Sequence, residues 1–288
     1  MMRQAETAET TTYWRHPCFP DLGLLKARFT RHRYDLHTHP TYVIALITSG
    51  CERIHIGRRD VLAPAGTIAI VNPEEWHDGE RGAEEGWAYR TFYPSVPLMT
   101  AIACELGQDC APSFPCALIE DTELAQGLAA AHEGAMLPDV LHAEEALLLA
   151  LRRLIVRHGN WDRRSGQAER SGSRARCVVY RELIESELNS RLDLQRLADI
   201  ARVTRFQVIR DFRKAIGVRP AVYIRDRRRR QACRLIEQGL GLAEAAAAAG
   251  FADQSHLSRT FRTAQGITPG MFRGVGAPPI SRQAPDAV

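Results

Sequence analysis

The feature that most constrains the fold of this chain is an internal repeat in its last third. The sequence Arg210-x-Phe212-Arg213 recurs as Arg259-x-Phe261-Arg262, at an offset of 49 residues. Both copies continue at the same offset with a glycine, a proline and an aromatic residue, which are Gly217 and Gly266, Pro220 and Pro269, and Tyr223 and Phe272. A constant offset over so many positions indicates that one structural unit is used twice.

Each copy predicts a helix, a short turn and a second helix. Alanine-rich segments, 194–201 and 242–249, precede the two copies, and Thr204 and Asp253 stand where the second helix should be capped. The glycine of each copy suits the left-handed residue that ends a helix, and the proline can begin the next helix. We therefore expect two helix-turn-helix units, joined by a long basic helix over 221–238.

The outward face of each second helix carries side chains suited to reading DNA. Arginine and glutamine can make bidentate contacts with guanine and adenine, while phenylalanine and isoleucine can meet the thymine methyl group. The alternative is an ordinary solvated helix face. We expect the DNA-contacting residues to be Arg205, Phe206, Ile209, Arg210, Gln254, Ser255, Ser258 and Arg259.

The distribution of charge supports a DNA-binding role for this part of the chain. Residues 174–274 hold 20 Lys and Arg against 10 Asp and Glu, whereas the remainder holds 18 basic and 24 acidic residues. A basic module attached to a mildly acidic one is typical of a protein that binds a polyanion through one part only. The run Arg227–Arg230 is expected to contact the DNA backbone.

The first part of the chain predicts short strands separated by corners that contain glycine and proline. Expected strands cover 42–47, 52–56, 59–62, 67–71 and 87–93, with a turn at Thr48–Gly50. This pattern indicates an antiparallel sandwich or barrel.

Beyond Pro97 the composition changes to that of helices, and one apolar stripe stands out. Its members follow a helical period, and they are Leu141, Leu147, Leu148, Leu151, Leu154 and Ile155. The stripe could pack on its own domain or against the same helix of a second subunit, and the sequence leaves both open.

The expected organisation is two domains joined by an exposed linker. The linker, 159–175, is rich in Gly, Ser and Arg and almost free of apolar residues. The fold class is an N-terminal antiparallel β-barrel with flanking helices (1–158), followed by an all-α domain with two helix-turn-helix units (176–274) and a flexible tail (275–288).

Composition excludes several other classes of protein. The chain is 45% hydrophobic and 25% charged, and no run approaches the ~18 to 20 apolar residues that a membrane helix needs. The first residues lack the apolar core of a signal peptide, and seven scattered cysteines do not form a disulfide framework. We expect a cytoplasmic protein without membrane association.

The C-terminal motifs resemble those of a known family. Residues 250–269, GFADQSHLSRTFRTAQGITP, look like the signature of the AraC/XylS family of bacterial transcription regulators, and 197–224 resembles the first half of the same domain. The resemblance implies a domain that binds double-stranded promoter DNA, usually as an activator acting with RNA polymerase. It is also compatible with a homodimer.

The N-terminal part resembles the cupin-like sensor barrel that many of these regulators carry. The segments that show this resemblance are LHTHPTYVIALITSG from Leu36, Gly57-Arg58, and PAGTIAIVNPEEWHDG from Pro64. The resemblance implies a small-molecule effector in the mouth of the barrel. Candidate residues for that site are His37, His39, Tyr42, Arg53, Trp76, His77 and Arg90, and we expect no catalytic residue, cofactor or metal.

An enzymatic alternative rests on three of these residues. Metal-dependent cupins hold a transition metal with a His-x-His pair, a glutamate and a later histidine, and this chain has His37, His39 and His77. Val43 and Ile44 stand where the glutamate is expected. Because three imidazoles can still bind zinc, a metal-dependent cupin enzyme fused to a DNA-binding domain is the second hypothesis. The sequence leaves open the effector, the promoter and its base preference, and the choice between activation and repression.

Overall fold

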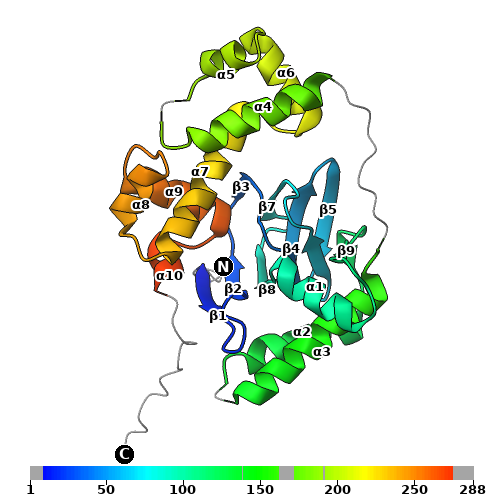
Figure 1. Cartoon of the computed structure of the whole chain (residues 1–288). Coiled ribbons are helices and arrows are strands. Elements are labelled where there is room, and N and C mark those ends of the chain that lie inside the picture. Colours follow the sequence, from blue (N-terminus) through cyan, green and yellow to red (C-terminus); the bar gives the residue numbers. More distant parts are fainter. Residues whose placement is uncertain (1–8, 138, 162–171, 191, 275–288) are drawn as a thin grey trace, which may run out of the picture. The chain divides into compact units, whose positions relative to one another are not determined.

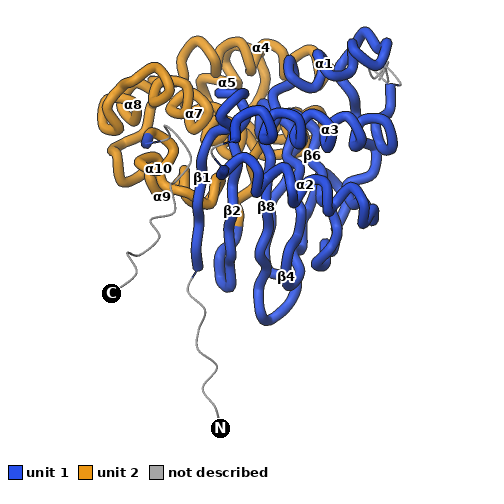
Figure 2. Tube along the Cα trace, turned by 90° about the horizontal axis from the view of Figure 1, so that it is seen from below, with its two compact units in different colours: residues 1–33, 39–162, 274–288 blue, residues 34–38, 163–273 orange. Residues whose placement is uncertain are grey.

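The structure, a computed structural model shown in Figure 1, describes residues 9–137, 139–161, 172–190 and 192–274. It divides into two compact units, which are coloured separately in Figure 2. The first unit comprises residues 1–33, 39–162 and 274–288, and the second comprises 34–38 and 163–273. A short stretch near the N-terminus, which contains strand β3 (Tyr34–His37), therefore packs with the C-terminal helices.

The first unit is built on antiparallel strands. They are β1 (Thr10–Arg15), β2 (Gly23–Phe29), β4 (Val43–Ile56), β5 (Arg59–Pro64), β6 (Ile68–Val71), β7 (His77–Arg81), β8 (Trp87–Tyr93) and β9 (Leu118–Ile119). Hydrogen bonds connect them in the order β1-β2-β8-β4-β6-β9, while β5 and β7 both pair with the second half of β4. The antiparallel, cupin-like sheet is confirmed, but among the described strands it does not close into a barrel.

Strand β4 pairs with β6 and β8 along its first half and with β5 and β7 along its second half. The prediction of a turn at Thr48–Gly50 is wrong, because the strand continues through these residues with a bulge between Ile47 and Ser49. A bulge bends a strand and increases its twist, so the two halves can pair in different directions. Gly50 has a φ of 68°, and a side chain there would meet the Gly86 carbonyl oxygen at 2.0 Å.

One face of the sheet packs against three helices, α1 (Val96–Glu105), α2 (Thr122–Gly134) and α3 (Val140–His158). The cross-strand partners Leu24, Phe92 and Ile44 lie on this face and belong to the shared core. The other face, called the helix-free face below, carries buried side chains as well, among them Phe29, Trp87 and Tyr89.

The apolar stripe of α3 divides between two environments. Leu147, Leu151, Leu154 and Ile155 are fully buried in the core of their own unit, whereas Leu141 is 73% exposed. Most of the stripe therefore packs on its own domain. A different set of apolar side chains on the same helix, which includes Leu149 and Val156, is exposed.

The second unit is almost entirely helical. Its helices are α4 (Gly172–Ser186), α5 (Leu194–Ile200), α6 (Arg205–Ala215), α7 (Pro220–Glu237), α8 (Leu242–Ala248), α9 (Gln254–Gln265) and α10 (Pro269–Arg273). The two helix-turn-helix units are α5 with α6 and α8 with α9, and α7 is the long helix expected between them. Of the helices described in both units, none has the length and apolarity needed to cross a membrane.

The repeat produces the same local structure twice. Thr204 and Asp253 cap α6 and α9 by accepting hydrogen bonds from backbone N–H groups of the first turn, as expected. Phe212 packs against Tyr223 with ring centroids 5.6 Å apart, and the corresponding pair Phe261 and Phe272 lies at 5.3 Å. The repeated aromatic positions are thus the contact that joins each second helix to the helix that follows it.

The linker between the domains ends earlier in the sequence than its composition suggested. Helix α4 begins at Gly172, inside the expected linker 159–175, and its polar first turn looked like linker sequence. Residues 162–171 and the expected tail 275–288 lie outside the described residues. The domain limits stay a prediction.

Candidate DNA-reading surface and effector site

Helices α6 and α9 present most of the expected DNA-contacting side chains to solvent. Arg205, Phe206 and Arg210 are exposed on α6, and Phe206 retains 77% of its accessible surface. Gln254, Ser255 and Arg259 are exposed on α9, whereas Ile209 and Ser258 are half-buried. A phenylalanine with this exposure gains little from the protein fold and is suited to a contact with a partner.

A buried carboxylate fixes the orientation of α6. Asp211 is fully buried and accepts a bidentate pair of hydrogen bonds from Arg176 of α4, at 2.6 and 2.8 Å. Tyr180 and Gln207 donate to the same carboxylate at 3.1 and 2.8 Å. Burial acts to raise the pKa of Asp211, but these hydrogen bonds outweigh it and hold the pKa well below its usual range.

Three members of the run Arg227–Arg230, which we expected to contact the DNA backbone, are bonded within the protein instead. Arg229 is 1% exposed and pairs with Asp226, and Arg227 forms an ion pair with Glu185. Arg228 donates to the carbonyl oxygens of Leu188 and Ser190. These side chains hold α7 against its neighbours, and the charge count alone could not distinguish that role from DNA binding.

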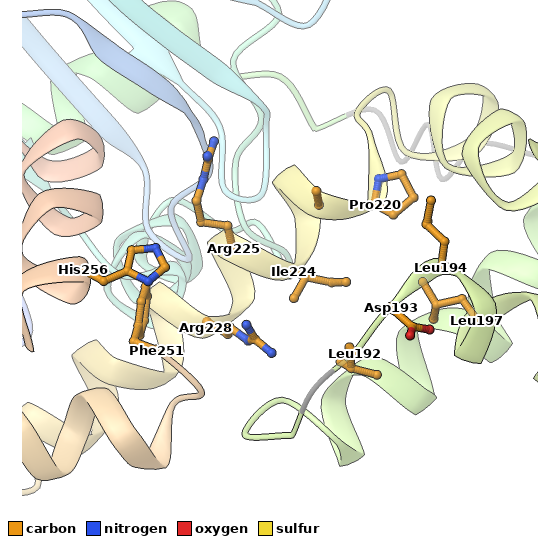
Figure 3. Close-up of a pocket in the computed structure, with 11 residues that line it drawn as sticks. Leu192, Asp193, Leu194, Leu197, Pro220, Ile224, Arg225, Arg228, Phe251 and His256 are labelled. Atoms are coloured by element: carbon orange, nitrogen blue, oxygen red, sulfur yellow. The ribbon is translucent and has the colours of Figure 1, made fainter. Parts of the chain in front are cut away.

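A cavity of about 280 Å³ lies between the two helix-turn-helix units (Figure 3). Leu194 and Leu197 line it from α5, Ile224 and Arg225 from α7, and Phe251 from the segment before α9. Arg225 is exposed, and among the described residues its guanidinium has no hydrogen bond or ion pair. It is therefore a cation without a described partner at the cavity between the two helix-turn-helix units.

A second buried carboxylate ties the stretch 34–38 to α7. The Thr38 hydroxyl donates to Asp226 Oδ2 at 2.7 Å, and Arg229 donates to the Thr38 carbonyl oxygen at 2.7 Å. Arg229 also pairs with Asp226 Oδ1 at 2.8 Å. All three residues are at most 4% exposed. We call this set, Thr38, Asp226 and Arg229, the threonine clip.

The structure brings two of the expected effector residues together. The rings of His39 and His77 are both buried, with centroids 5.2 Å apart, and His39 also lies 5.3 Å from the ring of Tyr93. The carbonyl oxygen of Trp76, the residue before His77, accepts a hydrogen bond from the Gly57 N–H. Tyr93 is an aromatic neighbour that sequence reasoning did not identify.

The other candidates lie elsewhere and have partners of their own. The Tyr42 hydroxyl donates to the Pro112 carbonyl oxygen at 2.6 Å within the helix-covered core. Arg90 pairs with Glu133 of α2, and Arg53 pairs with Asp60 across the β4–β5 hairpin. These contacts are sufficient to account for the three side chains as structural residues.

The metal-binding alternative involves three histidines. His37 lies in the stretch that packs with the second unit, and its Nδ1 is 2.6 Å from the Asp35 carbonyl oxygen. His39 and His77 belong to the first unit, where their rings are neighbours. Zinc binding stays the alternative hypothesis.

Glu52 is a buried acidic residue that the sequence analysis overlooked. It is 7% exposed, and burial raises the pKa of its carboxyl to about 8. The signal was present in the sequence, because Glu52 alternates with Ile54 and Ile56 and must share their buried side of β4.

Comparison with known families assigns both parts of the chain. A model of the AraC-like ligand binding domain matches residues 19–154, and a model of a helix-turn-helix domain matches 197–274. The uncharacterized HTH-type transcriptional regulator YbfI of Bacillus subtilis (strain 168) is 24% identical over 241 residues, which cover 83% of this chain and 87% of that protein.

Solved structures show the same two-domain fold. Unsaturated fatty acid bound wild-type ToxT from Vibrio cholerae strain SCE256 superposes with a TM-score of 0.53 at 14% identity, covering 94% of this chain and 98% of that one. An apo ToxT variant from the same strain gives 0.52 at 11% identity, with 94% and 98% covered. Because an AraC-like ligand-binding domain precedes a helix-turn-helix domain, and a relative along most of the chain is a transcriptional regulator, this protein belongs to the AraC family of transcriptional regulators.

Proposed function

We propose that this regulator reads two successive major grooves of promoter DNA with α6 and α9, under the control of a small molecule bound by the first unit. The observation that carries the proposal is the pair of matched helices, each capped at its N-terminus and each exposing base-reading side chains near that end. Successive major grooves on one side of B-DNA lie ~34 Å apart. One chain can then read both grooves without a partner.

The base contacts are assigned to Arg205, Phe206, Ile209, Arg210, Gln254, Ser255, Ser258 and Arg259. Arg205, Gln254 and Arg259 have no hydrogen bond or ion pair elsewhere among the described residues, so their polar groups are available to base edges. Arg210 bonds to Gln207, which itself donates to Asp211, so its position is set by the buried carboxylate network. We assign the backbone contact to Arg225 rather than to Arg227–Arg230.

Substitutions at these two kinds of position should have different effects on DNA binding. Arg259→Ala or Gln254→Ala should relax the base preference and cost about 1–3 kcal/mol at the preferred sequence. Arg225→Ala should weaken binding to all sequences alike and reduce the slope of log affinity against log salt by roughly one. Fluorescence anisotropy on selected and scrambled duplexes over a salt series measures both quantities.

Lys26→Ala is the matched control, because it removes an exposed cation from the first unit. It should change neither preference nor salt slope. If Arg259→Ala and Gln254→Ala leave the base preference intact, the assignment of α9 as a reading helix is wrong.

We propose that the threonine clip couples effector to DNA. Thr38 lies inside the segment matched by the ligand-binding model, yet it is bonded to the helix that separates the two reading helices. His39, one of the paired histidines, follows it directly in the chain. A ligand that binds beside His39 with different affinity in two arrangements of this stretch would shift the position of α7.

The coupling can be tested by removing one hydroxyl. Thr38→Val keeps the shape of the side chain but removes the donor to Asp226, so it should reduce the effector-dependent change in promoter affinity from the usual ~5- to 150-fold to near unity. Promoter affinity is measured on the full chain with and without a stabilising small molecule found by thermal-shift screening. Thr48→Val, at an exposed position, should retain the full response. A full response in Thr38→Val would show that the clip carries no coupling.

The exposed face of α3 supports a homodimer. Leu141, Leu149 and Val156 lie on one side of the helix and are 73%, 58% and 60% exposed. We propose that they pack against the same helix of a second copy. Leu149→Glu should then lower the sedimentation coefficient of the protein at micromolar concentration, while Val178→Glu, an exposed valine of α4, should not. A monomeric wild-type protein would exclude this interface.

We infer that the protein acts by binding and not by catalysis, that it works in the cytoplasm where its promoter lies, and that it activates transcription by contact with RNA polymerase. The support is the family to which it belongs.

A further inference from the structure

We propose that the effector of this regulator is an organic cation, a protonated amine that pairs with Glu52 on the helix-free face of the sheet. The inference rests on the effector-binding role proposed above and adds the chemical class of the ligand.

Strand register places Glu52 on this face. Gly50 of β4 is the cross-strand partner of Trp87, whose other neighbour is Phe29 of β2. Residues two apart on a strand point to the same side, so Glu52 follows Gly50 onto the side that carries Phe29 and Trp87. Ile54 and Ile56, the next residues in this alternation, are buried on the same side.

The Glu52 carboxylate has no hydrogen-bonding or charged partner among the described residues, although the side chain is almost completely buried. Its cross-strand neighbours are Ala63 of β5 and Arg81 of β7, and Arg81 is exposed and makes no ion pair with it. A carboxyl buried without a partner is costly, which is the reason that its pKa rises to about 8. A bound cation would supply the missing partner.

The face that carries Glu52 also carries a group of buried aromatic rings. Phe29, Trp87 and Tyr89 are buried, with the ring of Phe29 5.4 Å from that of Trp87 and 6.1 Å from that of Tyr89. The faces of aromatic rings attract cations, most strongly when water is excluded. An acidic side chain on the same face as these rings therefore favours an ammonium group, which stabilises the ionised carboxyl, over a carboxylate, which cannot.

Two further polar atoms on the same face lack partners. The Trp87 indole N–H and the Thr91 hydroxyl are both buried and make no hydrogen bond among the described residues. Thr91 lies four residues beyond Trp87 on β8, so the two groups are about 13 Å apart along the strand. Buried polar groups of this kind are usually satisfied, and a ligand with a polar group beyond its amine could satisfy them.

The test uses the full chain and a matched series of probes. Phenethylamine, 2-phenylethanol and 3-phenylpropionate share an apolar body and differ in the polar end, and butylamine and spermidine extend the amine series. We expect at least one amine to raise the melting temperature of the wild-type protein, while the alcohol and the carboxylate do not. Glu52→Gln should weaken amine binding at least about tenfold, and Glu84→Gln, at an exposed position of the same unit, should not.

A second measurement does not depend on any variant. Because the free carboxyl has a pKa of about 8 and the bound one would be ionised, amine binding to the wild type at pH 7 should release about one proton. Calorimetry in two buffers of different ionisation enthalpy measures this proton, and the amine affinity should increase from pH 6 to pH 8.

Several outcomes would overturn the proposal. They are binding of the carboxylate as tight as that of the amine, amine binding without proton release, wild-type affinity in Glu52→Gln, and no binding by any amine of the series. Promoter binding is measured in parallel on the same preparations. If the duplex is bound but no amine is, the amine proposal fails while the DNA-reading function stands.

Discussion

The arrangement of the DNA-binding unit depends on carboxylates buried between its helices. Asp211 is held by Arg176, Tyr180 and Gln207, and it locks the first reading helix to α4. Removing one partner from such a buried pair typically costs about 3–5 kcal/mol, because the remaining charge stays in the interior. Asp226 has the same role on α7, where it is bonded to Arg229 and Thr38. Both carboxylates define geometry more than they add net stability, since burying charge is itself unfavourable.

These two anchors also make the copies of the repeat unequal. The position that corresponds to Asp211 in the second copy is Thr260, which cannot form the same ion-pair network. The first reading helix is therefore fixed through α4, the helix that follows the linker. The second packs through Leu257 and Phe261 and through the Phe261–Phe272 contact. In a regulator built in this way, α4 can hold the first reading helix in place. A movement of α7 then changes the position of the second reading helix relative to the first.

Sequence patterns predicted the features that depend on local chemistry. The caps at Thr204 and Asp253, the left-handed Gly217 and Gly266, and the helices that start at Pro220 and Pro269 all follow from the requirements of helix ends. Strands β1 and β2 were not predicted, although Pro17 and Pro20 lie in the turn between them, because TTTYWR and GLLKARF lack a regular alternation of apolar and polar residues. The bulge at Ser49 resembled a turn because Gly50 follows it. The roles of Arg229, Asp211 and Thr38 depend on partners more than 30 positions away, so no local pattern could identify them.

The central claim is that one chain reads two adjacent major grooves with the two helices α6 and α9. Hydroxyl-radical and methylation-interference footprinting of the full-length protein on its promoter tests this claim directly. The account predicts two groups of guanines at which N7 methylation blocks binding, one helical turn apart on the same side of the duplex, with the second group lost in Arg259→Ala. A single protected groove per chain, or two groups that both survive this substitution, would contradict it.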